Sequence, residues 1–189
     1  MSRLIGLILL LFLIVQFSCV KKEEKQNSEK LPLRYININR QGGPIDTIYG
    51  RLDSKAFADS IYNLSYTEID YDGDTVRQSY ELPISNSKET FLNLKDTSEY
   101  RLQYKGLRYV KYDRQYIIYK YLVDDPNGED EEMNYYFVPE YGIVLIRSRA
   151  WGGYGRLVSN SEEQDFDKIF YLTERIVGGF HDFYMPENN

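Results

Sequence analysis

The chain has 189 residues and a formal net charge of −6, a length that predicts one domain with short appendages. An acidic chain without clustered Lys and Arg is poorly suited to contact phosphate backbones, which argues against a nucleic-acid partner. The 19 Tyr and 9 Phe favour β-strands, and the single Cys excludes an intramolecular disulfide.

The amino-terminal segment has the pattern of a secretory signal peptide. Residues 1–3 give a short basic start, and residues 4–15 form an apolar run. A membrane-spanning helix needs about 20 apolar residues, so the run is better suited to the core of a signal peptide than to a bilayer anchor. A single spanning anchor is the alternative.

The sequence Gln16-Phe17-Ser18-Cys19 follows this run. It resembles a bacterial lipobox, where the cysteine thiol receives a diacylglyceryl group and the leader is cleaved before the cysteine. Phe17 and Gln16 depart from the commonest lipobox pattern in the way typical of Bacteroidota lipoproteins. The resemblance implies an outer-membrane protein lipidated at Cys19, held by two or three acyl chains. A buried free cysteine is the alternative.

Three segments follow from this interpretation. Residues 1–18 are the expected signal peptide, residues 19–30 the lipidated cysteine and a polar tether, and residues 31–189 a single globular domain. Residues 21–25, Lys-Lys-Glu-Glu-Lys, resemble the export tag of surface-displayed lipoproteins of that phylum, although a solvated tether has the same composition. The face of the outer membrane, surface-exposed or periplasmic, therefore stays open.

The domain is predicted to start with two strands, over residues 33–38 and 45–52, joined by a turn at Gly42-Gly43-Pro44. Apolar residues at helical spacing follow over residues 57–64. A short helix therefore competes there with the strand pattern that runs through the same residues.

The clearest predicted hairpin comes next, with strands over residues 62–70 and 75–82. They flank Tyr71-Asp72-Gly73-Asp74, and an Asp-Gly pair between β-patterned segments is a strong turn signal. Residues 143–146 are continuously apolar, which predicts a central position in the sheet. Further strands are expected over residues 91–94, 100–104, 109–123, 135–138 and 143–149.

One helix is predicted near the carboxyl end, over residues 162–177. Ser161 and Gln164 fit a capping box, and Gly178-Gly179 ends the helix. The expected apolar stripe consists of Phe166, Ile169, Phe170, Thr173, Ile176 and Val177. The predicted fold class is therefore β-dominated α+β: an antiparallel sheet of about eight to ten short strands, as a sandwich or a curved half-barrel, with this helix packed on it.

Two acidic segments have some features of calcium sites. One places acidic residues at loop positions 1, 3, 5 and 12, but its sixth position is Thr75 where an EF-hand loop requires Gly. These residues are Asp70, Asp72, Asp74 and Glu81. The other segment spans residues 124–132. A solvated turn explains each segment equally well, so no metal ligand is assigned.

No catalytic constellation or cofactor motif is identified. His181 is the only histidine, and Asp182 directly beside it is poorly placed for a Ser-His-Asp triad. The chain has no Gly-x-Ser-x-Gly elbow, and lipidation consumes the one thiol. We therefore expect a non-catalytic protein.

The segment Trp151-Gly152-Gly153-Tyr154-Gly155 is a candidate contact surface. Trp151 and Tyr154 could stack on a sugar ring or anchor a partner protein. The alternative is a turn or bulge whose Trp closes the edge of the core.

Three triplets match the Asp-Ser/Thr-aliphatic pattern that is O-glycosylated on exported proteins of the Bacteroidota. They are centred on Thr47, Ser60 and Thr75. Modification requires an exposed hydroxyl at each position. Chance occurrence combined with strand propensity is the alternative.

The function expected from these features is binding. The domain is predicted to be a lipid-anchored binding or accessory module of an outer-membrane assembly, with an envelope protein or a glycan as its partner. One alternative is an envelope glycan hydrolase, which requires two carboxyl groups about 5–9 Å apart in a deep cleft. Another is a lipid or hydrophobe carrier, which requires an apolar cavity inside a curved sheet.

Overall fold

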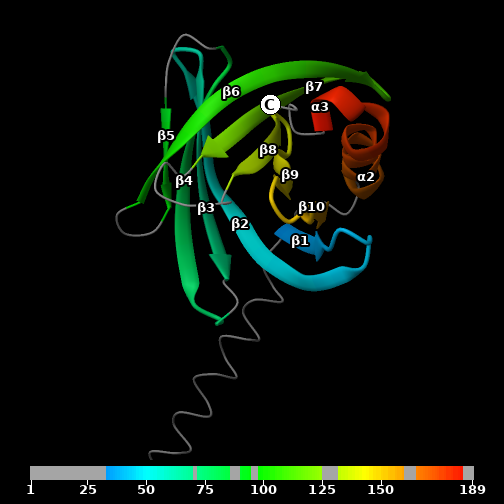
Figure 1. Cartoon of the computed structure of the whole chain (residues 1–189). Coiled ribbons are helices and arrows are strands. Elements are labelled where there is room, and N and C mark those ends of the chain that lie inside the picture. The colour runs from blue at the N-terminus through cyan, green and yellow to red at the C-terminus, as the bar shows by residue number, and fades with distance from the viewer. Residues whose placement is uncertain are drawn as a thin grey trace, which may run out of the picture.

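The computed structural model describes residues 33–69, 72–85, 90–94, 98–124, 132–159 and 165–184. The expected signal peptide, Cys19 and the tether lie outside these ranges. The described strands are β1 (Leu33–Ile38), β2 (Pro44–Ala58), β3 (Ile61–Ile69), β4 (Thr75–Pro83), β5 (Thr90–Leu94), β6 (Ser98–Lys111), β7 (Gln115–Asp124), β8 (Met133–Val138), β9 (Gly142–Ser148) and β10 (Tyr154–Ser159). The helical segments are α2 (Phe166–Glu174), η2 (Arg175–Gly179) and α3 (His181–Tyr184) (Figure 1).

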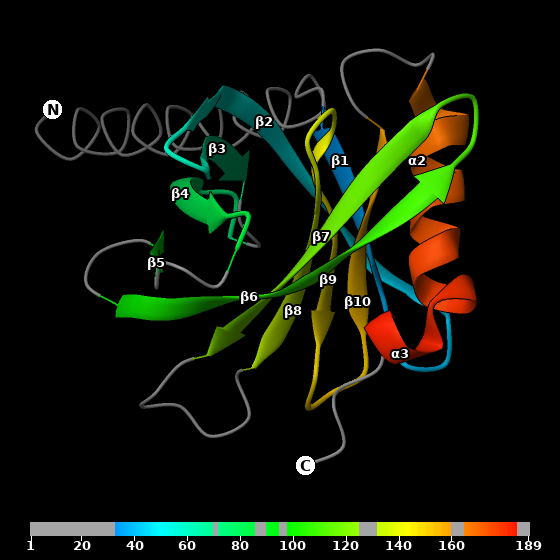
Figure 2. The same ribbon diagram turned by 90° about the horizontal axis from the view of Figure 1, so that it is seen from above.

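The strands form one antiparallel sheet that closes on itself. Each strand from β2 to β10 pairs with the next along the chain, and β1 pairs with both β2 and β10, so the two edges of the sheet meet and form a barrel. The predicted β-dominated α+β class is confirmed. Of the two arrangements considered, the curved sheet is observed and the sandwich is not. Figure 2, turned by 90°, shows the strands from above with α2 at one side of them.

The predicted central hairpin is also confirmed. β3 and β4 pair in register from Ile61 opposite Pro83 to Ile69 opposite Thr75. The competing short helix does not form, because β2 continues to Ala58 and a two-residue turn returns the chain into β3. Both turn residues have positive φ, 51° at Asp59 and 66° at Ser60. This conformation matches the right-handed twist of the strands that it joins.

The carboxy-terminal helix begins at Phe166 within the described residues and changes to wider π-helical turns at Arg175. Residues 161–164, and with them the expected capping box, lie outside the described ranges. Asp165 stands at the N-cap position without a side-chain capping hydrogen bond. The segment ends in the predicted region, at Gly179.

The predicted apolar stripe is partly wrong. Ile169, Thr173 and Ile176 are buried as expected, but Leu172 is also fully buried, whereas Phe166 and Phe170 are each 43% exposed. The helix contacts β9 and β10. It is therefore rotated so that residues at spacings of three and four from Ile169 face the barrel, and the two Phe rings stack on each other at its edge, 6.1 Å apart.

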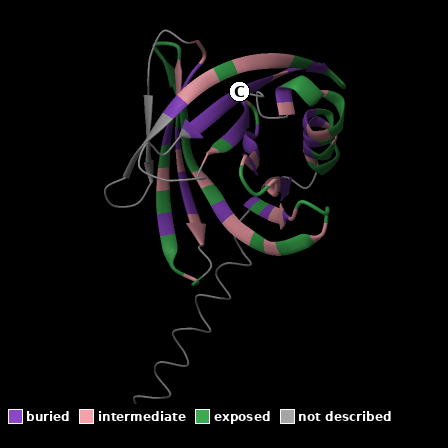
Figure 3. Cartoon of the chain, in the orientation of Figure 1, coloured by how far each residue is buried: buried purple, intermediate pink, exposed green. Residues whose placement is uncertain are grey.

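Strand alternation divides the core into two layers. Side chains such as Tyr66 and Phe137 fill the inside of the barrel, and side chains such as Tyr136 cover its outer face beneath the carboxy-terminal segment. Tyr136 makes an edge-to-face contact with Phe183 at 5.6 Å. Buried residues accordingly gather along β7 to β9 and on the barrel-facing side of α2 (Figure 3).

Buried tyrosine hydroxyls tie the strands together across the barrel. The backbone N–H of Ile143 donates to the Tyr66 hydroxyl at 2.9 Å, and the Tyr35 hydroxyl donates to the Ile143 carbonyl at 2.8 Å. Gly142 makes this approach possible, since a Cβ there would lie 2.3 Å from the Tyr66 hydroxyl and its φ is +85°. Three strands are thereby fixed at one buried residue.

Candidate functional site

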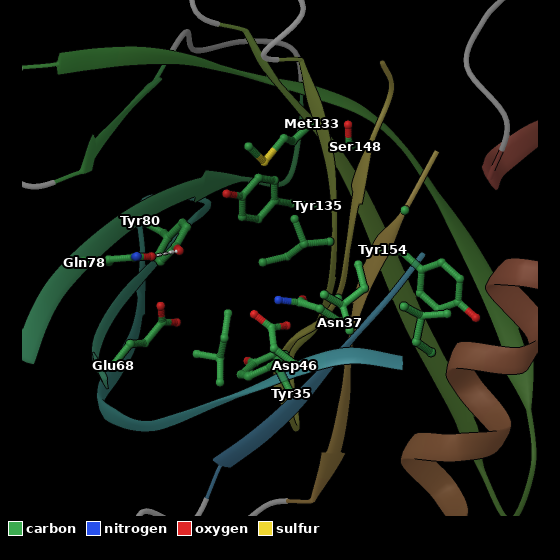
Figure 4. Close-up of a pocket in the computed structure, with 16 residues that line it drawn as sticks. Tyr35, Asn37, Asp46, Glu68, Gln78, Tyr80, Met133, Tyr135, Ser148 and Tyr154 are labelled. Atoms are coloured by element: carbon green, nitrogen blue, oxygen red, sulfur yellow. Dashed lines mark hydrogen bonds between the residues drawn. The ribbon is translucent and has the colours of Figure 1, made fainter. Parts of the chain in front are cut away.

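The inside of the barrel contains a cavity of about 550 Å³. Its wall is formed by side chains from β1 to β4 on one side and from β8 to β10 on the other (Figure 4). Most of this wall is apolar or aromatic, and it carries a few polar groups. A curved sheet that pairs with itself produces such an interior when the inward side chains do not fill it.

The cavity lies towards one end of the barrel. Most of the lining residues come from the half of their strand nearest the turns that join β1 to β2 and β9 to β10, and Tyr35 and Tyr80 lie just beyond the middle of theirs. We call this end the mouth. Ile45 and Met133 lie on the cavity wall near the start of β2 and at the start of β8, and they are 65% and 37% exposed. They form an apolar rim where the cavity meets solvent.

Two carboxyl groups point into the cavity, from Asp46 on β2 and Glu68 on β3 (Figure 4). Glu68 lies directly opposite Gly50, where a Cβ would approach the Glu68 side chain to 3.2 Å. Asp46 is paired with Asn37, whose amide oxygen would lie 2.7 Å from a Cβ on Gly155. Gly50 and Gly155 thus leave room for polar side chains inside the barrel.

Glu68 and one oxygen of Asp46 are shielded from solvent. Burial raises the pKa of Glu68 to about 7, with desolvation as its cause. Asp46 Oδ1 is shielded from solvent and has no hydrogen-bond partner among the described residues. Polar atoms in such positions are usually paired, and unpaired ones at a cavity wall point to a ligand group.

Four tyrosines line the cavity, Tyr35, Tyr80, Tyr135 and Tyr154. The rings of Tyr80 and Tyr135 lie 5.9 Å apart at a tilt of 52°. The Tyr80 hydroxyl donates to Gln78 Oε1, and Tyr35 is held through its hydroxyl by the Ile143 carbonyl. Burial raises the pKa values of Tyr35 and Tyr80 well above the usual range, so both stay neutral. These rings are fixed, uncharged surfaces.

The sequence interpretation did not identify Asp46, Glu68 or Asn37 as site residues. A signal was present, since Glu68 is in phase with the buried residues Leu64 and Tyr66, and polar residues in phase with a buried face are unusual. It could not be used without knowing that the strands close around a hollow. Asp46 entered the sequence interpretation only as part of a glycosylation triplet.

The predicted ligand contacts Trp151 and Tyr154 lie in and after the β9–β10 turn. Trp151 is 78% exposed and does not line the cavity, nor does it close the edge of the core. Tyr154 borders the cavity, but its ring points towards the helix (Figure 4) and meets Tyr184 edge-on at 6.4 Å. The assignment of either residue as a ligand contact stays a prediction.

The predicted glycosylation sites meet the requirement for exposure. Thr47 on β2, Ser60 in the β2–β3 turn and Thr75 at the start of β4 are all exposed. Their modification stays a prediction.

The remaining candidates form no site within the described residues. No group of three or more His, Cys, Asp or Glu side chains there could hold a metal ion. Asp70 and residues 125–131 lie outside the described ranges. Asp182 is turned to Arg108, with an N–O distance of 2.7 Å, and this hydrogen bond lowers the pKa of its carboxyl.

A second hollow of about 540 Å³ lies between the β1–β2 turn, the β9–β10 turn and the carboxy-terminal segment. Its wall includes Arg40, Arg147 and Arg149. Arg149 forms an ion pair with Glu132, and Arg147 donates to the Tyr184 carbonyl at 2.8 Å. Arg147 thereby joins β9 to the end of the helical segment, and Arg149 joins the β9–β10 turn to the residue before β8.

No protein-family model matches the sequence, and no curated protein is detectably similar to it. Two solved structures are similar in fold. One is a candidate lipoprotein from Parabacteroides distasonis, with a TM-score of 0.33 and 9% identity over 68% of this chain and 94% of that one. The other is a candidate exported protein with a YmcC-like fold from Bacteroides fragilis, with a TM-score of 0.34 and 12% identity over 66% of this chain and 92% of that one.

Both neighbours are described as lipoprotein or exported, the class of protein that the amino-terminal sequence predicts here. Their TM-scores lie below 0.5, so we draw no conclusion about function from either. Within the described residues, no helix combines the length and the apolar character needed to cross a membrane.

Proposed function

We propose that this protein is an outer-membrane lipoprotein that holds a small amphiphilic molecule inside its barrel without transforming it. The cavity carries this proposal. Its volume of about 550 Å³ falls within the range of small-molecule sites, which combine a mainly apolar wall with a few placed polar groups. Such a module would retain the ligand at the envelope or present it to an outer-membrane assembly.

The position of the mouth supports exchange of ligand with the surroundings. β1 runs from Leu33 towards Ile38, and Ile38 lies at the mouth. The lipidated Cys19 proposed above therefore connects to the barrel at the end remote from the mouth. The opening is directed away from the point where the tether joins the domain.

The composition of the wall distinguishes an amphiphile from a purely hydrocarbon ligand. A carrier for acyl chains needs an apolar interior, because carboxyl groups placed against hydrocarbon lose their solvation without gaining a partner. Asp46, Glu68, Asn37 and Gln78 all line this cavity. A ligand that carries both polar and apolar groups can form hydrogen bonds with these side chains and also pack against the apolar part of the wall.

Filling the cavity tests the proposal. Ile48→Trp places a large ring on the inward face of β2, and Thr47→Trp places the same ring on its exposed outer face as a matched control. Mass spectrometry of small molecules released from the mature protein, isolated from native membranes, should find the ligand with wild type and Thr47→Trp. It should be missing from Ile48→Trp. Equal recovery from both variants, each with an unchanged urea midpoint, would reject an internal ligand.

The anchor has its own test. Cys19→Ser should abolish cleavage of the leader and acylation of the mature amino terminus, because the modified thiol is the substrate of both steps. Intact-mass analysis and membrane fractionation check this. Unchanged processing and unchanged membrane association in the variant would contradict the lipoprotein assignment.

The two carboxyl groups also favour a second candidate, an envelope glycan hydrolase. With its pKa raised to about 7, Glu68 would be suited to act as a general acid and Asp46 as the base or nucleophile. Wild type should then release reducing ends from isolated envelope glycans, and Glu68→Gln should lower this rate at least a hundredfold. Equal rates with the two proteins would leave binding as the function.

A further inference from the structure

The ionisable side chains on the cavity wall are of one sign. Asp46 and Glu68 are the acids, and the wall as described contains no Lys, Arg or His. In a partly desolvated cavity, Coulomb interactions are stronger than in water, so these carboxyl groups attract a cationic group and repel an anionic one.

Both carboxyl groups also have acceptor atoms that the described residues leave unused. Asp46 Oδ1 is shielded from solvent and unpaired, and Glu68 has neither a hydrogen bond nor an ion pair in the described ranges. A buried acceptor without a donor is unfavourable, because it has lost its hydrogen bonds to water. A ligand with several N–H donors on one positive charge recovers this loss.

The aromatic side chains suit the same chemistry. The faces of Tyr80 and Tyr135 carry negative quadrupolar charge, which attracts an ammonium group, and they also cover apolar atoms. Ile48 and Ile146 extend the apolar wall beside them. One molecule with a positive head and an apolar body can use all of these surfaces.

We propose that the cavity selects an organic cation, a protonated primary amine joined to an apolar body, whose charge is paired with the carboxyl groups of Asp46 and Glu68. This inference rests on the proposed function, since it names the class of ligand that the same cavity holds. The apolar body packs against the tyrosine rings. An alcohol of the same length loses the ion pair, and a carboxylate of that length is repelled.

The test uses three probes of equal length: hexylamine, 1-hexanol and hexanoate. Each is titrated calorimetrically at pH 8 into the full mature lipoprotein in nanodiscs, and into empty nanodiscs as the baseline. Hexylamine should bind roughly ten- to a hundredfold more tightly than 1-hexanol, which corresponds to one charge-assisted interaction. Hexanoate should bind most weakly.

Single substitutions locate the selectivity. Asp46→Asn and Glu68→Gln keep side-chain size and should each weaken hexylamine binding roughly tenfold while leaving 1-hexanol unchanged. Asp59→Asn removes the same charge from an exposed turn at the far end of the barrel and should change neither. Thermal unfolding of each variant confirms that the fold is kept.

The outcomes separate the two proposals. If 1-hexanol binds as tightly as hexylamine, or if the two cavity variants bind hexylamine as wild type does, the amine inference is overturned and the binding function stands. If calcium chloride binds at these carboxyl groups and excludes hexylamine, the preferred cation is a metal and the inference is also overturned. If no probe binds, the proposed function fails and the inference fails with it.

Discussion

The two ends of the barrel interior differ in how they are filled. At the mouth, Asp46 and Glu68 face a hollow. At the opposite end the inward positions carry aromatic rings in contact. Phe137 lies 4.9 Å from Tyr62 and 6.2 Å from Tyr119, measured between ring centroids. Inward positions on β3 and β8 alternate through both ends, and the side chains at these positions are large aromatic rings at the solid end and include carboxyl groups at the mouth.

This difference assigns distinct roles to the two ends. The solid end contains fully buried rings and supplies much of the free energy of unfolding, because each ring removes a large apolar area from water. The hollow end buries less apolar area and so contributes less to stability, and it also places carboxyl groups where few water molecules reach them. The packing at the solid end therefore stabilises the fold enough for the other end to contain a cavity.

The largest effect is expected at the solid end. Phe137→Ala should lower the free energy of unfolding by about 3–5 kcal/mol, since Phe137 is fully buried among other rings. Ile48→Ala, on the cavity wall, should cost about 1–2 kcal/mol because its side chain already borders empty space. Urea unfolding of both variants measures the contrast. Equal losses would contradict the division into solid and hollow ends.

A second contrast compares two glycines with positive φ, Gly142 at the start of β9 and Gly73 in the β3–β4 turn. Gly142→Ala should cost about 3–4 kcal/mol, because the new Cβ displaces the Tyr66 hydroxyl from Ile143 in addition to straining the backbone. Gly73→Ala has nothing within 4 Å of the new Cβ and should cost about 1 kcal/mol. Thermal unfolding of the pair checks this ranking.

The carboxyl group of Glu68 predicts a pH dependence of stability in the empty protein. Burial raises its pKa from 4.5 to about 7. Between these values the folded protein retains the proton and the unfolded chain releases it, so the free energy of unfolding falls as pH rises from about 4.5 to about 7. The loss should be about 2–3 kcal/mol and should be missing in Glu68→Gln.

The groups that face Glu68 do not obscure this measurement. Tyr35, Tyr66 and Tyr80 stay neutral throughout, because burial raises their pKa values. Asp46 is present in both proteins, so the difference between wild type and Glu68→Gln isolates Glu68. If the free energies of unfolding of wild type and Glu68→Gln change in parallel from pH 4 to pH 8, Glu68 is well solvated and the prediction is wrong.

The smallest effect is expected at Trp151. Its side chain is 78% exposed in the β9–β10 turn, so Trp151→Ala should change the free energy of unfolding by less than about 0.5 kcal/mol. A loss of partner or glycan binding without loss of stability would support its assignment as a contact residue. A loss above about 1 kcal/mol in urea unfolding would instead indicate a packing role.

Local sequence patterns predicted most of the strands, but β10 was missed, and residues 109–123 contain the turn between β6 and β7 instead of forming one strand. The boundaries of β1, the β3–β4 hairpin and the position of the helix followed from alternation, the Asp-Gly turn and the glycine pair. The extension of β2 to Ala58 was missed because residues 57–64 also have helical spacing. Tertiary pairing decided between the two patterns.

The cavity could not be predicted in the same way. It exists because β1 pairs with β10, and no pattern within either segment specifies that contact. Glu68 is next to an exposed turn in sequence and became a cavity residue only through closure. The exposure of Phe166 and Phe170 likewise depends on how the helix is rotated against β9 and β10.

Closure through β1 has a consequence for biogenesis. Arg34 in β1 pairs with Ser159 in β10. The first strand of the domain therefore cannot complete its pairing until β10 is present. If the chain is secreted amino terminus first, as the proposed lipoprotein would be, it cannot complete the ring until almost all of it has crossed the inner membrane. The polypeptide that passes through the membrane is therefore not yet closed into a barrel. A nascent chain truncated before residue 154 would keep two unsatisfied sheet edges and be a substrate for envelope proteases.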